Sequence, residues 1–308
     1  MMFGDGEKFE YLECAACGCM QISQIPDNIA QYYPKDFYSF TTAPDSKISS
    51  IEALLRTQRM KYLLQGNQRV GMLLSKVLRK IFGTRIPEYY YNNWFRRIQL
   101  SSDAAILDVG CGSGKLLLDM RLEGFTHLTG VDPFIEQDIF YDNGVTIFKK
   151  TIEEMDEQFD FIMLNHSFEH MSEPLKMLKE LYRLLKPNSY VLLRMPVAGC
   201  FVWQKYGVNW VALDAPRHFY IHTIKSTQLL AEQAGFAVKD IAFDSHAYQF
   251  WASEQILKNI AVTAPNSYAV NPQASIFSEQ EIQNFIARSI ELNQTGQGDA
   301  AGFYLYKA

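Results

Sequence analysis

An apolar segment that ends abruptly in three alternating glycines is the feature of this 308-residue chain that most restricts its fold. Residues 104–109 predict a short, buried strand, and residues 115–122 predict the helix that follows it. Gly110, Gly112 and Gly114 therefore form a turn from strand to helix. Glycine permits positive φ and lets backbone N–H groups approach a ligand, and the helix adds the positive end of its dipole. The turn is predicted to bind a ligand.

The next strand indicates which ligand the turn suits. Residues 127–131 predict a strand that ends at Asp132, and a carboxylate there can accept both hydrogen bonds of a ribose diol. A dinucleotide-binding turn has the spacing Gly-x-Gly-x-x-Gly. This turn instead has Gly-x-Gly-x-Gly, with Asp108 just before it, so it matches a nicotinamide site imperfectly. The glycine turn and the acid together indicate an adenosine-containing ligand.

These residues resemble the class I methyltransferases that use S-adenosylmethionine. Ile106-Leu-Asp-Val-Gly-Cys-Gly-Ser-Gly114 is similar to their first motif, and Asp132 is similar to their ribose-binding acid. A later block, with Phe159-Asp160, Glu169-His170 and Leu185-Lys-Pro, also resembles the family, although Asn188-Ser189 stands where Gly-Gly is usual. The resemblance is firm over about residues 100–245 and looser on both flanks. It implies S-adenosylmethionine as cofactor and S-adenosylhomocysteine as product.

The resemblance also assigns the cofactor-binding residues by position. The glycine turn is expected to hold the methionyl end and Asp132 the ribose. Residues 151–153 are expected to hold the adenine ring, and Asn165 and His166 to line the methyl side. The full predicted set is Asp108, Gly110, Cys111, Gly112, Gly114, Asp132, Pro133, Thr151, Ile152, Glu153, Asn165 and His166.

Composition places the chain among ordinary globular proteins, with 48% hydrophobic and 20% charged residues. No apolar run approaches the roughly 18 residues of a membrane span. The N-terminus carries charged and polar residues where a signal peptide needs an apolar segment, so we expect a cytoplasmic protein.

Five cysteines, three of them within six residues, do not form a disulfide framework, and reduced thiols are expected.

Residues 1–46 form a predicted N-terminal arm that contains a Cys-x-x-Cys-Gly knuckle. The knuckle comprises Cys14, Cys17 and Gly18, and Cys19 follows it directly. It resembles the second half of the zinc ribbon that precedes some methyltransferases of this type. A structural zinc ion needs four ligands, and one knuckle supplies two. We therefore expect no bound metal; the alternative is that Cys19 or a partner chain supplies the missing ligands.

Residues 47–100 form a predicted basic helical segment. Between Lys47 and Arg97 there are eleven Lys or Arg residues against two Glu. Apolar residues recur at three- and four-residue spacing from Val70 to Ile81, which predicts an amphipathic helix. Gly83 is expected to end this helix, and Pro87 supports the stop. The basic face is expected to be solvated. The alternative is attraction to an anionic substrate, a phosphate or a lipid headgroup, with peripheral membrane contact; no nucleic-acid motif accompanies the charge.

Residues 101–308 alternate strand and helix patterns, which is typical of a mostly parallel sheet covered by helices. Further strands are predicted at 145–148, 159–164, 190–196, 237–243 and 302–306. The expected class is an α/β, Rossmann-like, doubly wound fold with seven strands and an N-terminal helical extension. Insertions at about 198–222 and 246–298 are long enough to cover a substrate.

Methyl transfer from a sulfonium mainly requires alignment of donor and acceptor, because the cofactor is already activated. An acceptor hydroxyl benefits from a base of near-neutral pKa, which favours histidine. His218, in Asp214-Ala-Pro-Arg-His218, is the first candidate, and His170 is the second. The alternative is that these residues only pin the insertion to the sheet by hydrogen bonds.

The sequence thus predicts methyl transfer from S-adenosylmethionine to a small-molecule acceptor, at oxygen. A sugar, a lipid-linked intermediate and a secondary-metabolite intermediate all fit as acceptor, and the oligomeric state is left open. Two alternatives are a binding protein of the same fold without turnover and a nicotinamide-dependent oxidoreductase, because fold alone does not establish activity.

Overall fold

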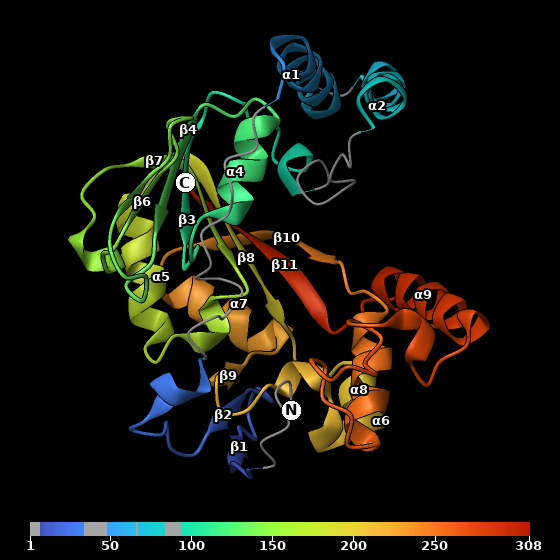
Figure 1. The fold of residues 1–308 in the computed structure, drawn as a ribbon. Helices are drawn as coiled ribbons and strands as arrows, with labels where there is room; N and C mark the ends of the chain where they lie inside the picture. The colour runs from blue at the N-terminus through green and yellow to red at the C-terminus, as the bar shows by residue number, and fades with distance from the viewer. Residues whose placement is uncertain (1–6, 34–47, 66, 84–93) are drawn as a thin grey trace. The chain divides into compact units, whose positions relative to one another are not determined.

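The structure is a computed structural model that describes residues 7–33, 48–65, 67–83 and 94–308 (Figure 1). The chain divides into two compact units, each built from discontinuous segments. The first unit comprises Met1–Pro34, His166–Leu178 and Leu193–Leu305, and the second comprises Lys35–Asn165, Lys179–Leu192 and Tyr306–Ala308. Among the described residues, no helix has both the length and the apolar character needed to cross a bilayer.

The strands predicted around the glycine turn form a parallel sheet in the second unit. β3 (Ala105–Val109) pairs in parallel with both β4 (His127–Val131) and β7 (Phe159–Asn165), and β4 pairs in parallel with β6 (Thr146–Phe148). β3 and β7 consist largely of buried apolar residues, as expected of strands covered on both faces. A two-residue strand, β5 (Ile139–Phe140), pairs antiparallel with β6.

Within the described residues, the sheet has eight strands in the order β10-β11-β8-β7-β3-β4-β6-β5. The remaining members are β8 (Leu185–Pro196), β10 (Ala237–Phe243) and β11 (Ala300–Lys307), and β8 contributes residues to both units. The helices α4 (Lys115–Leu122), α5 (Pro174–Leu184) and α7 (Ile224–Gln233) alternate with strands along the chain. The predicted α/β class is confirmed. The eighth strand is β5, which is too short to give a recognisable pattern.

Two helices, α1 (Ser50–Leu64) and α2 (Gln68–Phe82), precede the sheet in the second unit. The Ser49 hydroxyl caps α1 by accepting a hydrogen bond from the Glu52 amide at 3.2 Å. Gly83 ends α2 in the left-handed conformation, with φ of 61°, as the sequence predicts. Lys47 and Pro87 lie outside the described residues.

A buried ion network connects α1 to the end of α4. Nη1 of Arg56 lies 3.0 Å from Oε1 of Glu123, and Nη2 of Arg56 lies 2.8 Å from Oε1 of Glu52. Arg59 also pairs with Glu123, whose side chain is fully buried. The expectation of a solvated basic face is therefore wrong for Arg56 and Arg59, since the internal carboxylates neutralise both guanidinium groups.

Loss of the shared carboxylate should destabilise the second unit strongly. Glu123→Ala leaves the guanidinium groups of Arg56 and Arg59 buried with less compensating charge, which costs about 3–5 kcal/mol of unfolding free energy. Urea unfolding of the full chain measures this loss, with exposed Glu157→Ala as the control. Equal unfolding midpoints for the two variants would contradict the role of the network.

The N-terminal arm belongs to the first unit. β1 (Tyr11–Glu13), β2 (Met20–Ile22) and β9 (Tyr220–Ile221) form a three-stranded antiparallel sheet in the order β1-β2-β9. The knuckle between β1 and β2 is closed by a hydrogen bond of 2.7 Å from the Gly18 amide to the Cys14 carbonyl. The Thr223 hydroxyl donates to the Cys17 carbonyl at 2.7 Å. The knuckle is thus held by backbone and hydroxyl hydrogen bonds.

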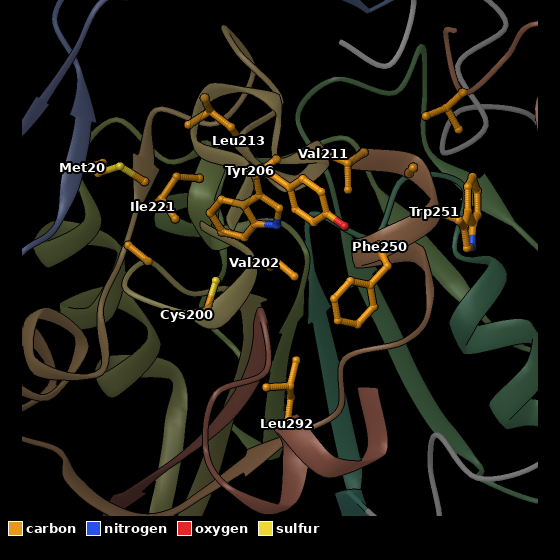
Figure 2. Close-up of a cluster of buried hydrophobic side chains, with 14 of the residues drawn as sticks. Met20, Cys200, Val202, Tyr206, Val211, Leu213, Ile221, Phe250, Trp251 and Leu292 are labelled. Carbon is orange, nitrogen blue, oxygen red and sulfur yellow. The ribbon is translucent and has the colours of Figure 1, made fainter. Parts of the chain in front are cut away.

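The two predicted insertions share one hydrophobic core in the first unit, shown in Figure 2. It is formed by α6 (Phe201–Tyr206), α8 (Tyr248–Leu257) and α9 (Glu279–Gln294), with β2 and β9 contributing Met20 and Ile221. Trp210 is almost fully buried within it, and its indole Nε1 donates to Oδ2 of Asp299 at 3.0 Å. The insertions therefore have a core of their own and are not irregular loops.

Candidate functional site

The glycine turn has the backbone conformation that its sequence predicts. Gly110, Gly112 and Gly114 have φ of 74°, 54° and 79°, a region that favours glycine. A Cβ atom at Gly114 would lie 2.5 Å from Cδ1 of Ile147, so no larger residue fits there without rearrangement. Gly114 is also the N-cap of α4, which directs the N-terminus of that helix toward the turn.

Asp132 is fixed against this turn by two backbone hydrogen bonds. Its Oδ2 accepts from the Gly112 amide at 2.8 Å, and its Oδ1 accepts from the Phe134 amide at 2.9 Å. Each oxygen keeps a second lone pair, so the carboxylate can still accept from a ribose diol. Burial raises the pKa of Asp132, although both amides oppose the shift.

Asp108 and Cys111 support the turn from within the sheet. Asp108 is buried at the end of β3, and burial together with the charge of Asp132 raises its pKa to about 8. A Cβ atom at Gly130 would lie 2.5 Å from Sγ of Cys111, so that thiol packs against β4. Burial also raises the pKa of the Cys111 thiol. Both side chains thus shape the turn.

Other predicted cofactor residues follow the carboxyl ends of neighbouring parallel strands in the second unit. Pro133 is exposed after β4, Thr151 and Ile152 come after β6, and Asn165 ends β7. The Thr151 amide donates to Oε2 of Glu154 at 2.7 Å, which orders the turn that contains Ile152 and Glu153. Open α/β sheets bind ligands at this edge. These residues therefore follow strand ends of the parallel sheet, and their binding of the cofactor stays a prediction.

Two residues near the turn were missed by the sequence analysis. The Tyr141 hydroxyl donates to the Ser113 carbonyl at 2.7 Å, and it comes from the segment after β5. Phe134, whose amide donates to Asp132, leaves 78% of its surface exposed. Phe134 could have been found from the sequence, because it is an aromatic residue two positions after Asp132. Tyr141 could not, because it follows β5, a strand that the sequence pattern did not predict.

The fold and this edge define a class I methyltransferase dependent on S-adenosylmethionine. A methyltransferase domain family matches residues 85–241, and the chain belongs to that family. A ubiquinone biosynthesis O-methyltransferase of Pseudomonas putida is 31% identical over 168 residues, which cover 48% of this chain and 71% of that protein. An S-adenosylmethionine dependent methyltransferase structure from Mesorhizobium loti is 11% identical and aligns with a TM-score of 0.44, over 71% of this chain and 99% of that one.

A cluster in the first unit brings together the two predicted catalytic histidines. The rings of His170 and His218 lie edge to face with centroids 4.7 Å apart. Glu169 joins them, and one ligand atom from each of the three residues lies within 4.8 Å of the others. We call these three residues the Glu169 cluster. The Phe219 amide donates to the Glu169 carbonyl at 2.9 Å, which ties the strand region of β9 to the turn after β7.

His218 is buried and differs from the near-neutral base that the sequence predicts. Burial, helped by neighbouring His170, lowers its pKa to about 4. Asp214, expected to orient the ring, has Oδ2 3.9 Å from Nε2 of His218, but Arg217 binds both oxygens of that carboxylate. His218 is therefore uncharged near neutral pH, and the role of both histidines as bases stays a prediction.

His166 belongs to the first unit, directly after Asn165 in the chain. Its Nδ1 lies 3.4 Å from Oε1 of Glu169, and its Nε2 contacts Arg194. Its predicted place beside the transferred methyl group stays a prediction. The cysteines of the knuckle also remain untested as zinc ligands. Among the described residues, the structure brings three side chains of types that can hold a metal ion close together in the Glu169 cluster.

Removal of the Asp132 carboxylate should weaken S-adenosylmethionine binding. Asp132→Ala deletes the predicted acceptor of the ribose hydroxyls and releases the Gly112 amide, which should weaken binding by about 1.5–3 kcal/mol. Titration calorimetry with S-adenosylhomocysteine measures the change, and exposed Asp142→Ala is the matched control. Unchanged affinity in Asp132→Ala would exclude this carboxylate from the cofactor site.

Asp108 should make the stability of the chain depend on pH. Its folded pKa of about 8 lies above the unfolded value near 4, so the folded state keeps a proton that the unfolded state releases. Stability therefore falls as pH rises from about 4 to 8, by up to about 5 kcal/mol. Asp108→Asn should flatten this fall in urea unfolding at several pH values, and Asp142→Asn should retain it. A steeper fall in Asp108→Asn would contradict the assignment.

Proposed function

We propose that this methyltransferase transfers the methyl group to an oxygen atom of a small-molecule acceptor. The observation that carries the transfer itself is the glycine turn bound to Asp132, which supplies positive-φ glycines, oriented amides and a ribose acceptor in one unit. The choice of oxygen is supported by the similarity to the Pseudomonas putida protein, which is an O-methyltransferase. A sugar, lipid-linked or other hydroxylated intermediate fits this chemistry.

The residues of the second unit are assigned to binding and orientation. The sulfonium of the bound cofactor supplies an activated methyl group, so alignment and exclusion of water account for most of the catalysis. The amides of the glycine turn are assigned to the methionyl end, Asp132 to the ribose, and residues 151–153 to the adenine. Asn165 is assigned to the methyl side of the cofactor.

Deprotonation of the acceptor hydroxyl is assigned to the Glu169 cluster as a unit. His218 is buried, whereas His170 is partly exposed and can meet an acceptor. Glu169 lies close to both imidazoles, with one ligand atom from each of the three residues within 4.8 Å of the others. In this assignment His170 contacts the acceptor, and the buried Glu169 and His218 lie beside it.

An anionic acceptor is favoured by the exposed charge of α2. Arg69, Lys76, Arg79 and Lys80 are all exposed on this helix. Met72, Leu73 and Ile81 are also exposed, so peripheral contact with a lipid-linked acceptor is part of the same proposal. The KM of an anionic acceptor should therefore rise as salt increases beyond about 0.1 M.

Methyl-labelled S-adenosylmethionine tests the proposal directly. With hydroxylated acceptors, including phenolic quinone precursors, the chain should form an O-methyl product. His218→Ala should lower kcat by about 100-fold while the affinity for S-adenosylhomocysteine stays unchanged. Exposed His127→Ala should behave like the wild-type chain.

Other outcomes identify the alternatives. Binding of S-adenosylhomocysteine without transfer to any hydroxylated acceptor would indicate a binding protein. Methyl transfer to nitrogen or carbon alone would overturn the choice of oxygen. Binding of NADH in place of S-adenosylhomocysteine would indicate an oxidoreductase.

A further inference from the structure

The Glu169 carboxylate is buried without a hydrogen-bond donor at normal distance. Its side chain is fully buried, and neither oxygen accepts a hydrogen bond from the part of the chain that the structure describes. The nearest nitrogens are Nδ1 of His166, at 3.4 Å from Oε1, and Nε2 of His218, at 3.9 Å from the same oxygen. A buried carboxylate is unfavourable unless a cation or donors compensate its charge. Among the described residues, no donor at hydrogen-bond distance therefore compensates the Glu169 carboxylate.

The two histidines of the cluster are fixed in the tautomer that metal ligands use. Nδ1 of His170 lies 2.8 Å from the Arg217 carbonyl, and Nδ1 of His218 lies 2.8 Å from the Ala212 carbonyl. A carbonyl oxygen only accepts, so each Nδ1 carries the proton and each Nε2 keeps a lone pair. Donation from the second ring nitrogen to a backbone carbonyl is the usual support of a metal-binding histidine.

The groups around the cluster do not supply the missing charge. Asp214 is neutralised by Arg217, which binds both of its oxygens. Arg194 pairs with Asp244 and contacts His166, so its charge is also shared. The Glu169 carboxylate thus lies beside His170 and His218 with no hydrogen-bond donor of its own among the described residues, and one ligand atom from each of the three residues lies within 4.8 Å of the others. A divalent cation placed among them would satisfy all three groups.

We propose that Glu169, His170 and His218 bind a divalent transition-metal ion, with zinc as the best match. Two imidazoles and one carboxylate form a recurring zinc donor set, whereas Mg²⁺ and Ca²⁺ prefer oxygen ligands. Ligand atoms in tetrahedral zinc sites lie about 3.3 Å apart, as bonds of about 2.0 Å require. Atoms now within 4.8 Å of one another reach this geometry by inward shifts of about 1 Å.

Three protein ligands leave the fourth position of zinc open to water or to another oxygen ligand. Partly exposed His170 gives that position a path to solvent. Zinc lowers the pKa of a bound hydroxyl, so the ion could activate an acceptor oxygen; this role rests on the proposed function. Metal binding itself does not depend on methyl transfer, because the ligands and their tautomers are set by the fold.

Zinc and cobalt binding to the full-length chain, measured without any acceptor, test the site. After treatment with a chelator, the chain should take up about one zinc ion, by elemental analysis and calorimetry. Glu169→Gln and His218→Ala should weaken zinc binding by about 100-fold or more. Exposed His127→Ala and the double variant Cys14→Ser/Cys17→Ser should bind zinc as the wild-type chain does. Circular dichroism verifies that each variant is folded.

Cobalt spectroscopy of the unaltered chain identifies the ligands even if a variant fails to fold. Bound Co²⁺ should show visible absorption without a thiolate charge-transfer band. Zinc lost only in the cysteine variant, a thiolate band with cobalt, or no uptake by the wild-type chain would each overturn the proposal. Zinc binding without methyl transfer would support the metal site while rejecting the proposed function.

Discussion

The hydrogen bond between the Gly112 amide and the Asp132 carboxylate is the interaction on which the edge of the sheet that is proposed to bind the cofactor depends. It joins the glycine turn after β3 to the acid after β4, at 2.8 Å. The parallel register, with Asp108 opposite Gly130 and Val109 opposite Val131, ends the two strands at the same level. The carboxylate is thereby a structural acceptor, and each of its oxygens retains a lone pair for the ribose hydroxyls that we propose it binds. Strand pairing thus sets the positions of Gly112 and Asp132, which are proposed to bind the cofactor.

Two buried carboxylates show how the surroundings set opposite charge states. Burial raises the pKa of Asp108 to about 8, and the charge of Asp132 adds to the shift. Burial also opposes ionisation of Glu169, but the imidazoles of His166, His218 and His170 outweigh it and hold the pKa of Glu169 at about 2. Asp108 is therefore protonated and supports the turn at neutral pH, whereas Glu169 is ionised and attracts cations.

Local patterns predicted the parts of this protein that short-range physics determines. The glycine spacing predicted the turn, and Gly83 predicted the end of α2, because both depend on positive φ. The burial of Arg56 was not predictable, because its partner Glu123 lies 67 residues away in sequence. His170 and His218 were each identified, but their meeting with Glu169 depends on how the insertion folds back. Long-range pairing, rather than residue type, limited the prediction.

The N-terminal arm explains how the loop that carries His218 is held in place. β2 pairs with β9, and the Tyr11 hydroxyl donates to the His218 carbonyl at 2.6 Å. The Phe219 amide donates to the Glu169 carbonyl, so the residues on both sides of the peptide bond after His218 are fixed. Because the backbone and Nδ1 of His218 are already hydrogen-bonded, Nε2 is the ring nitrogen that can bind another group. The arm therefore fixes the direction in which His218 presents its lone pair, which a metal ligand and a proton acceptor both require.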